Sequence, residues 1–341
     1  LLPEVQQDLG VGAGAEDVPL PFQLLAQLAV VVDLAVEGDP VTVVGAGHRL
    51  VAALDPSDSV GIIDSHFPEA HFFTEFERFD RHVDKLRLVH PGEAIDYVSI
   101  CSPNYLHDSH MRFALRSGAD AICEKPLVLN PWNLDGLLEM QEATGRNIST
   151  ILQLRVHPAI QDLRNTIAQE ARSTKHEVDL AYVTSRGRWY LQSWKADVKK
   201  SGGIATNIGV HFFDMLHFVF GDLQLNQVHH VSDTKAGGFL EYERARVRWF
   251  LSIDAQDVPQ PLRDKGQRTF RSITVDGREI EFSEGFTDLH TVSYQQILSG
   301  QGFGPEQSRS AISAVAHIRK ASPLGLVGEC HPALVAALKS A

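Results

Sequence analysis

The chain is poor in cysteine, in long apolar runs and, near its N-terminus, in basic residues. Only three of its 341 residues are cysteines, and they form neither a CxxC pair nor an even-numbered set. This usage argues against a disulfide framework and favours a reducing compartment, so we expect a cytoplasmic protein. The apolar run from Leu24 to Val32 contains Gln27 and ends at Asp33, which is too short for a transmembrane helix. The chain opens at Leu1 without a basic region, from which we expect no signal peptide.

The first 48 residues contain no lysine and no arginine. They hold seven acidic residues, so this segment carries −7 of the formal net charge of −12. All 31 basic residues follow it, together with the other 36 acidic ones (43 − 7). An acidic protein has little nonspecific affinity for nucleic acid or an anionic membrane surface, so we expect neither as a partner. An anionic ligand therefore requires a local cluster of basic side chains.

Length and composition are those of a globular protein with two domains. A hydrophobic content of 43% supplies enough apolar material for two cores. In the first domain, short apolar runs at 96–101 and 119–123 are each followed by a polar loop and a helical period. This alternation predicts a doubly wound α/β domain, in which ligands bind beyond the carboxyl ends of the strands. Residues 102–104 and 124–126 lie at that edge.

The residues after Gln153 have the alternating pattern of antiparallel strands. Apolar side chains alternate over 178–182, and a β-rich run spans 245–252. Asp276 and Gly277 separate two further runs, and Asp-Gly suits the type I′ turn of a hairpin. We therefore predict a second, α+β domain with an open, mostly antiparallel sheet.

Two glycine patterns near the N-terminus imitate a dinucleotide-binding loop. The first, Gly-Val-Gly-Ala-Gly-Ala from Gly10, has Asp33 about 20 residues later, but no buried strand precedes it and prolines follow where a helix should begin. The second, Gly45-Ala-Gly47, follows a strand-like run, and a short helix over 48–54 is one way to complete it. A lone glycine pattern is weak evidence, so both stay open.

Two short motifs hold residues that could transfer a proton. Lys125 lies between an acid and a proline at the end of a buried strand, where poor solvation can lower the pKa of a lysine. The run over 202–217, if it forms one helix, places Asn207, His211 and Asp214 on the same face. Taken alone, the first motif is better explained by a surface lysine and the second by a histidine of the core.

The histidines do not indicate a metal site. His107 and His110 are three residues apart, but no cysteine or carboxylate follows at a spacing typical of ligands. We predict no bound metal.

Together the two motifs resemble the glucose-fructose oxidoreductase and inositol dehydrogenase family. Glu-Lys-Pro at 124–126 is followed, some 80 residues later, by Gly-Gly-x3-Asn-x3-His-x2-Asp at 202–214. Longer stretches, at 59–64, 98–107, 186–190, 205–211 and 282–290, are similar to UDP-N-acetyl-2-amino-2-deoxyglucuronate dehydrogenases of bacterial surface-polysaccharide pathways. The resemblance implies a Rossmann-like domain, NAD as cofactor, a nucleotide-sugar substrate oxidised at a secondary hydroxyl, C3 of the hexuronate, and a homo-oligomer, often a tetramer.

The resemblance also implies roles for individual residues. Lys125 and His211 become the catalytic pair. Asn207 lies where many members carry aspartate, so an orienting hydrogen bond replaces a charge beside the histidine. Asp55 takes the acidic position that binds the adenosine ribose, which favours NAD because a 2′-phosphate would be repelled. The other expected cofactor contacts are Gly45, Gly47, Ser102, Pro103, Asn104, His107 and Glu124.

A basic, aromatic segment is the candidate substrate wall. A nucleotide-linked uronate carries roughly three negative charges, which an acidic protein can bind only through concentrated cations. Residues 184–200 contain five basic residues against one aspartate, interleaved with aromatic side chains, although a solvated loop would have the same composition. The expected substrate-binding residues are Gln153, Arg155, Arg186, Trp189, Lys195 and Asn207.

The N-terminal segment departs from the family pattern. In the family, the strand at 50–55 is preceded by a first strand, a glycine loop and a whole helix, and residues 41–47 leave no room for that helix. We therefore expect an anomalous segment over 1–46, for which a frame error or a wrong start is the leading explanation. It is followed by a dinucleotide-binding domain over 47–126 and by a substrate and oligomerisation domain over 127–341 whose last helix packs back on the first domain. Two functions follow: an NAD-dependent sugar-nucleotide dehydrogenase, or a catalytically weak sugar-nucleotide-binding chain without a competent glycine loop.

Overall fold

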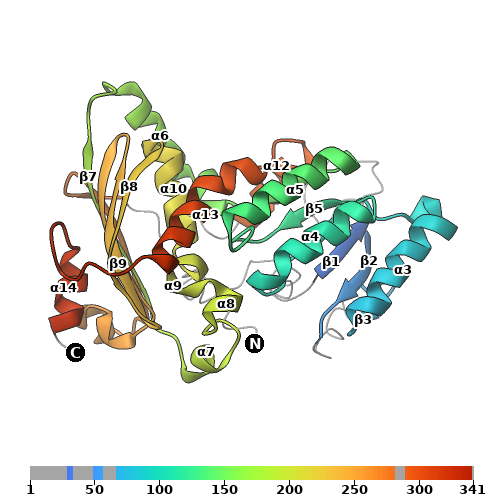
Figure 1. The fold of residues 1–341 in the computed structure, drawn as a ribbon, viewed down its shortest axis with the longest axis horizontal. Coiled ribbons are helices and arrows are strands. Elements are labelled where there is room, and N and C mark those ends of the chain that lie inside the picture. The colour runs from blue at the N-terminus through green and yellow to red at the C-terminus, as the bar shows by residue number, and fades with distance from the viewer. Residues whose placement is uncertain (1–28, 34–48, 57–66, 281–288, 340–341) are drawn as a thin grey trace. The chain divides into compact units, whose positions relative to one another are not determined.

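The computed structural model describes residues 29–33, 49–56, 67–280 and 289–339. These residues form two compact units, each with its own six-stranded sheet (Figure 1). The described residues up to Leu152, with 289–308, make the first unit, and the described residues from Gln153 onward, without 289–308, make the second. The first unit thus continues past the boundary predicted at residue 126, because the helix and strand after it complete its sheet. Within the described residues, no helix is long and apolar enough to cross a membrane.

The sheet of the first unit has the strand order β3-β2-β1-β4-β5-β6, which is the order of a doubly wound dinucleotide-binding sheet. The pairs β2·β3, β4·β5 and β5·β6 are parallel, as the α/β prediction requires. Its strands are β1 (Ala29–Asp33), β2 (Arg49–Leu54), β3 (His71–Phe73), β4 (Tyr97–Ile100), β5 (Asp120–Cys123) and β6 (Ile148–Thr150).

The central strand β1 runs in the opposite direction to its neighbours. It pairs antiparallel with both β2 and β4, so that its first residue, Ala29, lies opposite Leu54 and Ile100. Its last residue, Asp33, lies opposite Arg49, at the amino end of β2. Asp33 is therefore at the edge away from the carboxyl ends of the parallel strands, which corrects its candidacy as a ribose-binding acid. The helix considered over 48–54 is likewise wrong, because Arg49–Leu54 is a strand.

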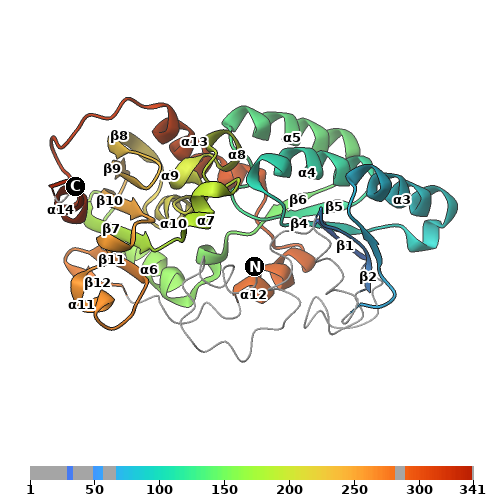
Figure 2. The ribbon, with the colours of Figure 1, turned by 90° about the horizontal axis from the view of Figure 1, so that it is seen from below.

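Helices cover both faces of this sheet. The helices α3 (Phe76–Val89), α4 (His107–Arg116) and α5 (Pro131–Thr144) lie on one face (Figure 2). The helix α12 (Leu289–Leu298), from late in the chain, packs on the other, where Tyr294 and Ile297 contact Ile122 and Ile151. Tyr294 also hydrogen-bonds to strand β4, with its hydroxyl 2.5 Å from Ser99 Oγ.

The second unit is built on a mixed, mostly antiparallel sheet, as predicted. Its order is β12-β11-β7-β10-β9-β8, and only β7 and β10 pair in parallel. At the predicted hairpin, Asp276 (φ 51°) and Gly277 (φ 77°) have the two positive φ angles of a type I′ turn. The strands are β7 (His176–Thr184), β8 (Leu223–Val231), β9 (Lys235–Tyr242), β10 (Ala245–Ser252), β11 (Thr269–Val275) and β12 (Arg278–Glu279).

One face of this sheet forms the largest core of the second unit. Apolar side chains of α6, α10 and α13 pack there against strands β7 to β11, around the fully buried Trp249. The C-terminal α14 covers part of the other face, where Leu334 contacts Val183 and Phe250, so the last helix packs on the sheet of its own unit and the packing on the first domain expected from the sequence is corrected. The helices are α6 (Pro158–Gln169), α7 (Arg188–Gln192), α8 (Val198–Ser201), α9 (Gly203–Asn207), α10 (Val210–Phe220), α11 (Gln260–Arg263), α13 (Pro305–Lys320), which begins in the first unit, and α14 (Pro332–Lys339).

Candidate functional site

The carboxyl edge of the first sheet gathers the polar residues predicted from the sequence. Asp55 follows β2 directly, is 7% exposed, and donates its amide to the carbonyl of Phe73 at 3.0 Å. Ser102 lies two residues after β4, and Glu124 directly follows β5. Because β2, β4 and β5 run in the same direction, all three residues reach one edge of the sheet. This is the edge at which a doubly wound sheet binds its ligand.

The loop after β4 is held by the helix that follows it. Ser102 and Asn104 are buried and Pro103 is half-buried; Asn104 starts a single 3₁₀ turn (Asn104–Leu106) that leads into α4. His107 opens α4 and is 1% exposed, with both ring nitrogens at hydrogen-bond distance from backbone carbonyls. The His107 ring therefore contacts the backbone of the loops at this edge and is not accessible to solvent.

The loop after β5 carries the charged part of this edge. The Glu124 amide donates to the carbonyl of Ile100 at 2.9 Å, and the next peptide bond but one, Lys125–Pro126, is cis. Glu124 Oε1 lies 3.0 Å from His290 Nε2, and its Oε2 accepts the Lys125 amide at 3.3 Å. Burial raises the pKa of Glu124, but the hydrogen bond and charge of His290 and the charge of Lys125 outweigh it, so the pKa lies below its usual value.

His290 is a residue that the sequence prediction missed. It belongs to α12, 166 positions after Glu124, and its imidazole contacts the Glu124 carboxylate at the carboxyl edge of the first sheet. The only signal was its place at the end of the family-like stretch 282–290, and no spacing rule connects it to the Glu-Lys-Pro motif.

The predicted glycine loop cannot be placed. Gly45 and Gly47 lie outside the described residues. What the described part shows is the direction of β1: its carboxyl end is at the opposite edge from Asp55, Ser102 and Lys125. In a dinucleotide-binding domain, the first strand ends at the ligand edge and leads through a glycine loop into a helix N-terminus that binds the pyrophosphate. β1 has the position of that first strand in the sheet, between β2 and β4, but it runs in the opposite direction.

In the second unit, the run over 202–217, predicted as one helix, forms two separate helices, α9 and α10. α9 ends at Asn207 and α10 begins at Val210, with a turn through Ile208 and Gly209 between them. Glycine is required at 209, since a Cβ there would lie 2.6 Å from both the Ala205 carbonyl oxygen and Leu251 Cδ1. The expected common helical face of Asn207, His211 and Asp214 is thus wrong for Asn207, whereas His211 and Asp214 share α10.

Arg155 is bound to α10 by a buried ion pair. Its Nε and Nη2 donate to the two carboxylate oxygens of Asp214 at 2.8 and 2.7 Å, with both side chains at most 6% exposed. Burial raises the pKa of Asp214, and the hydrogen bonds and charge of Arg155 oppose that rise. The pair joins the 3₁₀ turn η5 (Gln153–Val156), which carries the buried Gln153, to the helix that carries His211.

We expect Arg155→Lys to lower the free energy of unfolding by about 1.5 kcal/mol, because an ammonium group cannot make the two parallel hydrogen bonds of the guanidinium. Chemical denaturation measures this loss, with Arg172→Lys at an exposed position as the control. A higher KM for substrate with unchanged stability would instead show that Arg155 acts on the ligand and not through Asp214.

Asn207 is oriented by a tyrosine of the basic segment. Its Nδ2 donates to the hydroxyl of Tyr190 at 2.9 Å, and Tyr190 is 1% exposed. Burial raises the pKa of Tyr190, with the Asn207 hydrogen bond opposing it. In the sequence, Tyr190 is only one of the aromatic residues interleaved with basic ones over 184–200, because its contact with Asn207 spans 17 positions between two short helices. The amide at 207 donates to the Tyr190 hydroxyl, whereas a carboxylate at this position would have to accept from it, so the substitution reverses the direction of this hydrogen bond.

The basic segment starts at the carboxyl edge of the parallel pair β7·β10. The Arg186 amide donates to the carbonyl of Ile253 at 3.1 Å, directly after β10. Trp189 lies in α7, and Lys195, half-buried, follows that helix with its Nζ 6.0 Å from the Trp194 ring centroid. The structure thus places Arg186, Trp189 and Lys195 in one continuous stretch of the second unit.

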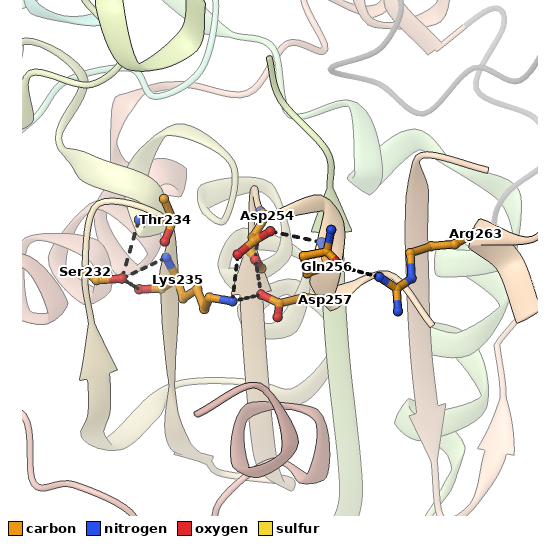
Figure 3. Close-up of polar contacts among 8 residues, drawn as sticks. Ser232, Thr234, Lys235, Asp254, Gln256, Asp257 and Arg263 are labelled. Atoms are coloured by element: carbon orange, nitrogen blue, oxygen red, sulfur yellow. Dashed lines mark hydrogen bonds and ion pairs between the residues drawn. The ribbon is translucent and has the colours of Figure 1, made fainter. Parts of the chain in front are cut away.

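An ion-pair network fixes the loop to which Arg186 bonds (Figure 3). Lys235 Nζ lies 3.1 Å from Asp254 Oδ2 and 2.5 Å from Asp257 Oδ2, and Ser252 Oγ donates to Asp257 at 2.6 Å. Burial lowers the pKa of Lys235, but the hydrogen bonds and charges of its two carboxylate partners outweigh burial. The pKa of Lys235 therefore lies above its usual value. The network keeps Ile253, between Ser252 and Asp254, at the end of the sheet. Within the described residues, no group of three or more His, Cys, Asp and Glu side chains could hold a metal ion.

Two family profiles match the chain in the two regions described above. Residues 41–152 match the oxidoreductase family with an NAD-binding Rossmann fold, and residues 174–255 match the C-terminal alpha/beta domain of the same oxidoreductase family. The matches confirm the predicted fold class and the family resemblance.

Solved structures and curated proteins add detail. The WlbA (WbpB) dehydrogenase of Thermus thermophilus, crystallised with NAD and alpha-ketoglutarate, is 52% identical with a TM-score of 0.80, over 83% of this chain and 91% of that one. The same dehydrogenase with NAD and UDP-GlcNAcA gives 51% and 0.79 over the same shares. D-glucoside 3-dehydrogenase of Escherichia coli K12 is 27% identical over 42% of this chain, and a putative UDP-kanosamine synthase oxidoreductase subunit of Amycolatopsis mediterranei is 28% identical over 60%. These alignments span 40% and 56% of the length of the two curated relatives.

Proposed function

Because this chain belongs to the oxidoreductase family with an NAD-binding Rossmann fold, we propose that it is an NAD-dependent dehydrogenase of a UDP-linked N-acetylated hexuronate. The reaction oxidises a secondary hydroxyl, at C3 of the sugar, to a ketone, as a step in making sugars for bacterial surface polysaccharides. The observation that carries the proposal is the position of Lys125, at the carboxyl end of β5 and at the same sheet edge as Asp55 and Ser102. The Thermus dehydrogenase, with NAD and UDP-GlcNAcA in its crystals, supports the choice of cofactor and substrate class.

The carboxyl edge fits the two ends of NAD. Asp55 is buried at the end of β2, where a carboxylate can accept hydrogen bonds from the adenosine ribose. Ser102, Glu124 and Lys125 lie after β4 and β5, where the nicotinamide end would be held. The pyrophosphate between these ends lacks its usual support in the part of the chain that the structure describes, because β1 does not end at this edge.

When bound, NAD supplies the acceptor for the hydride that leaves the carbon bearing the hydroxyl. The work of the chain is to remove the hydroxyl proton. Lys125 and His211 are the proposed groups, since an amine or an imidazole in its neutral form can accept that proton from the oxygen as the ketone forms. Asn207, held by Tyr190, and Gln153, buried in η5, are polar groups that can orient the sugar.

The substrate charge is matched by the basic segment. Arg186 and Lys195 are half-buried there, and guanidinium and ammonium groups bind diphosphate and carboxylate oxygens through charge-assisted hydrogen bonds. Arg155 stabilises the contact between η5 and α10, since its guanidinium is already paired with Asp214.

The test is direct. The purified chain is mixed with NAD and UDP-GlcNAcA, and the absorbance of the reduced nicotinamide is followed as substrate is added. Turnover that depends on both compounds supports the dehydrogenase. Binding of UDP-GlcNAcA by calorimetry without turnover supports the second function, a sugar-nucleotide-binding chain with a defective cofactor site, which the reversed β1 favours.

We expect Asp55 to disfavour NADP by at least about tenfold, or ~1.4 kcal/mol, because its carboxylate repels a 2′-phosphate. Titration calorimetry of the two dinucleotides measures the ratio, and Asp55→Asn should reduce it. Equal affinity of the parental chain for both dinucleotides would remove Asp55 from the cofactor site.

A further inference from the structure

His107 connects the two loops that carry the candidate cofactor and catalytic residues. Its Nε2 lies 2.7 Å from the carbonyl oxygen of Ser102, in the loop after β4. Its Nδ1 lies 2.8 Å from the carbonyl oxygen of Pro126, in the loop after β5. One rigid ring thus spans two segments that are 24 positions apart in the sequence, and Pro126 directly follows Lys125.

Both partners of His107 are backbone carbonyls, which accept hydrogen bonds and cannot donate them. A neutral imidazole has one N–H and can donate to one of the two, whereas an imidazolium donates to both. Burial lowers the pKa of His107, while the two carbonyls and the Glu124 charge raise it and the Lys125 charge lowers it. Glu124 and Lys125 are thus the charged groups that act on this ring.

A second histidine of α4 acts on the same loop. His110 Nδ1 lies 3.0 Å from Ser102 Oγ, and its ring is stacked on Phe76 with the centroids 5.3 Å apart. Ser102 is therefore held twice: His107 contacts its backbone carbonyl, and His110 contacts its side-chain hydroxyl. A buried ring with polar contacts at both nitrogens is not needed merely to fill space, because an apolar ring would do so without a desolvation cost.

We propose that His107 is a positioning residue for the reaction: it ties the Ser102 loop to the Lys125–Pro126 loop and so sets the distance between the cofactor-binding edge and the catalytic lysine. Its two ring nitrogens face backbone carbonyls, so in this proposal it acts through the two loops and not on the reacting atoms. This inference rests on the proposed function and replaces the direct cofactor contact expected from the family resemblance.

The test uses two variants of the full chain. His107→Phe keeps a ring but offers no donor to either carbonyl, and His107→Gln offers an amide that can donate. His90→Gln, at an exposed position of the same unit, is the matched control. We expect His107→Phe to lower kcat by at least about tenfold while the KM for UDP-GlcNAcA stays within about twofold, because misplacement of a catalytic group costs rate more than binding. His107→Gln should recover part of the lost kcat, and the control should match the parental chain.

Hydrogen exchange gives a readout that does not depend on activity. We expect His107→Phe to speed the exchange of the amides of Ser102 and Asn104 in one loop and of Glu124 and Lys125 in the other by at least about tenfold, with no change in β10. Faster exchange throughout the first unit with kcat unchanged would show a structural role only and would overturn the proposal, as would unchanged exchange in either loop. If His107→Phe does not fold, the same comparison is made between His107→Gln and the parental chain. If the parental chain has no turnover, the proposed function fails, whereas exchange in the two loops still decides whether His107 ties them together.

Discussion

Replacing residues 1–48 by a strand, a GxGxxG loop and a helix in register with Leu50 should raise the affinity for NAD by at least about 100-fold, or ~2.7 kcal/mol. The reason is the direction of β1. Its amino end, at Ala29, lies beside Leu54 and Ile100 at the ligand edge, and its carboxyl end lies at the opposite edge. The backbone amides of a glycine loop and a helix N-terminus, which normally supply a large share of dinucleotide affinity, cannot follow β1 at the edge where Asp55 and Ser102 lie.

Titration calorimetry of the parental and hybrid chains with NAD measures the difference. The control hybrid carries the same inserted unit with its three glycines changed to alanine, which keeps the strand and helix but crowds the approach of the pyrophosphate. Affinity should rise only in the hybrid with the glycines. Micromolar affinity in the parental chain, with no gain in the hybrid, would show that residues 1–48 complete the cofactor site as they are, and would make Gly45 and Gly47 the candidate loop.

Lys125→Ala and His211→Ala should each reduce turnover by at least about 100-fold, the effect expected when a proton-transfer group is lost. The KM for the sugar nucleotide should change much less, because both groups act as the hydroxyl loses its proton. The assay is the initial rate of nicotinamide reduction, measured in the parental chain or, where its NAD affinity limits the rate, in the hybrid with the restored glycine loop.

Lys265→Ala and His317→Ala, at exposed positions, are the matched controls and should keep the parental rate. Near-parental turnover in either test variant would remove that residue from catalysis. A fall in turnover that is matched by a fall in the folded fraction would place its effect on stability instead. Unfolding midpoints of all four variants separate these outcomes.

The sequence alone determined the elements whose patterns are local. The apolar runs at 96–101 and 119–123 became β4 and β5, and the run 245–252 became β10 with the predicted bounds. The Asp276–Gly277 turn formed as predicted because two positive φ angles in a row suit few other residue pairs. The family, the fold class and the sheet edge that carries Lys125 followed from the same short motifs, since strand, loop and helix signals depend on neighbouring residues.

The tertiary structure decided the contacts that set the site. The direction of β1, the pairing of Arg155 with Asp214, and the contacts of Glu124 with His290 and of His107 with Pro126 all join distant positions of the chain. No periodicity in the sequence encodes these contacts. The direction of β1 is not encoded because an apolar strand fits a sheet in either direction. A buried charge, likewise, takes whichever partner the packing of the helices brings within hydrogen-bond distance.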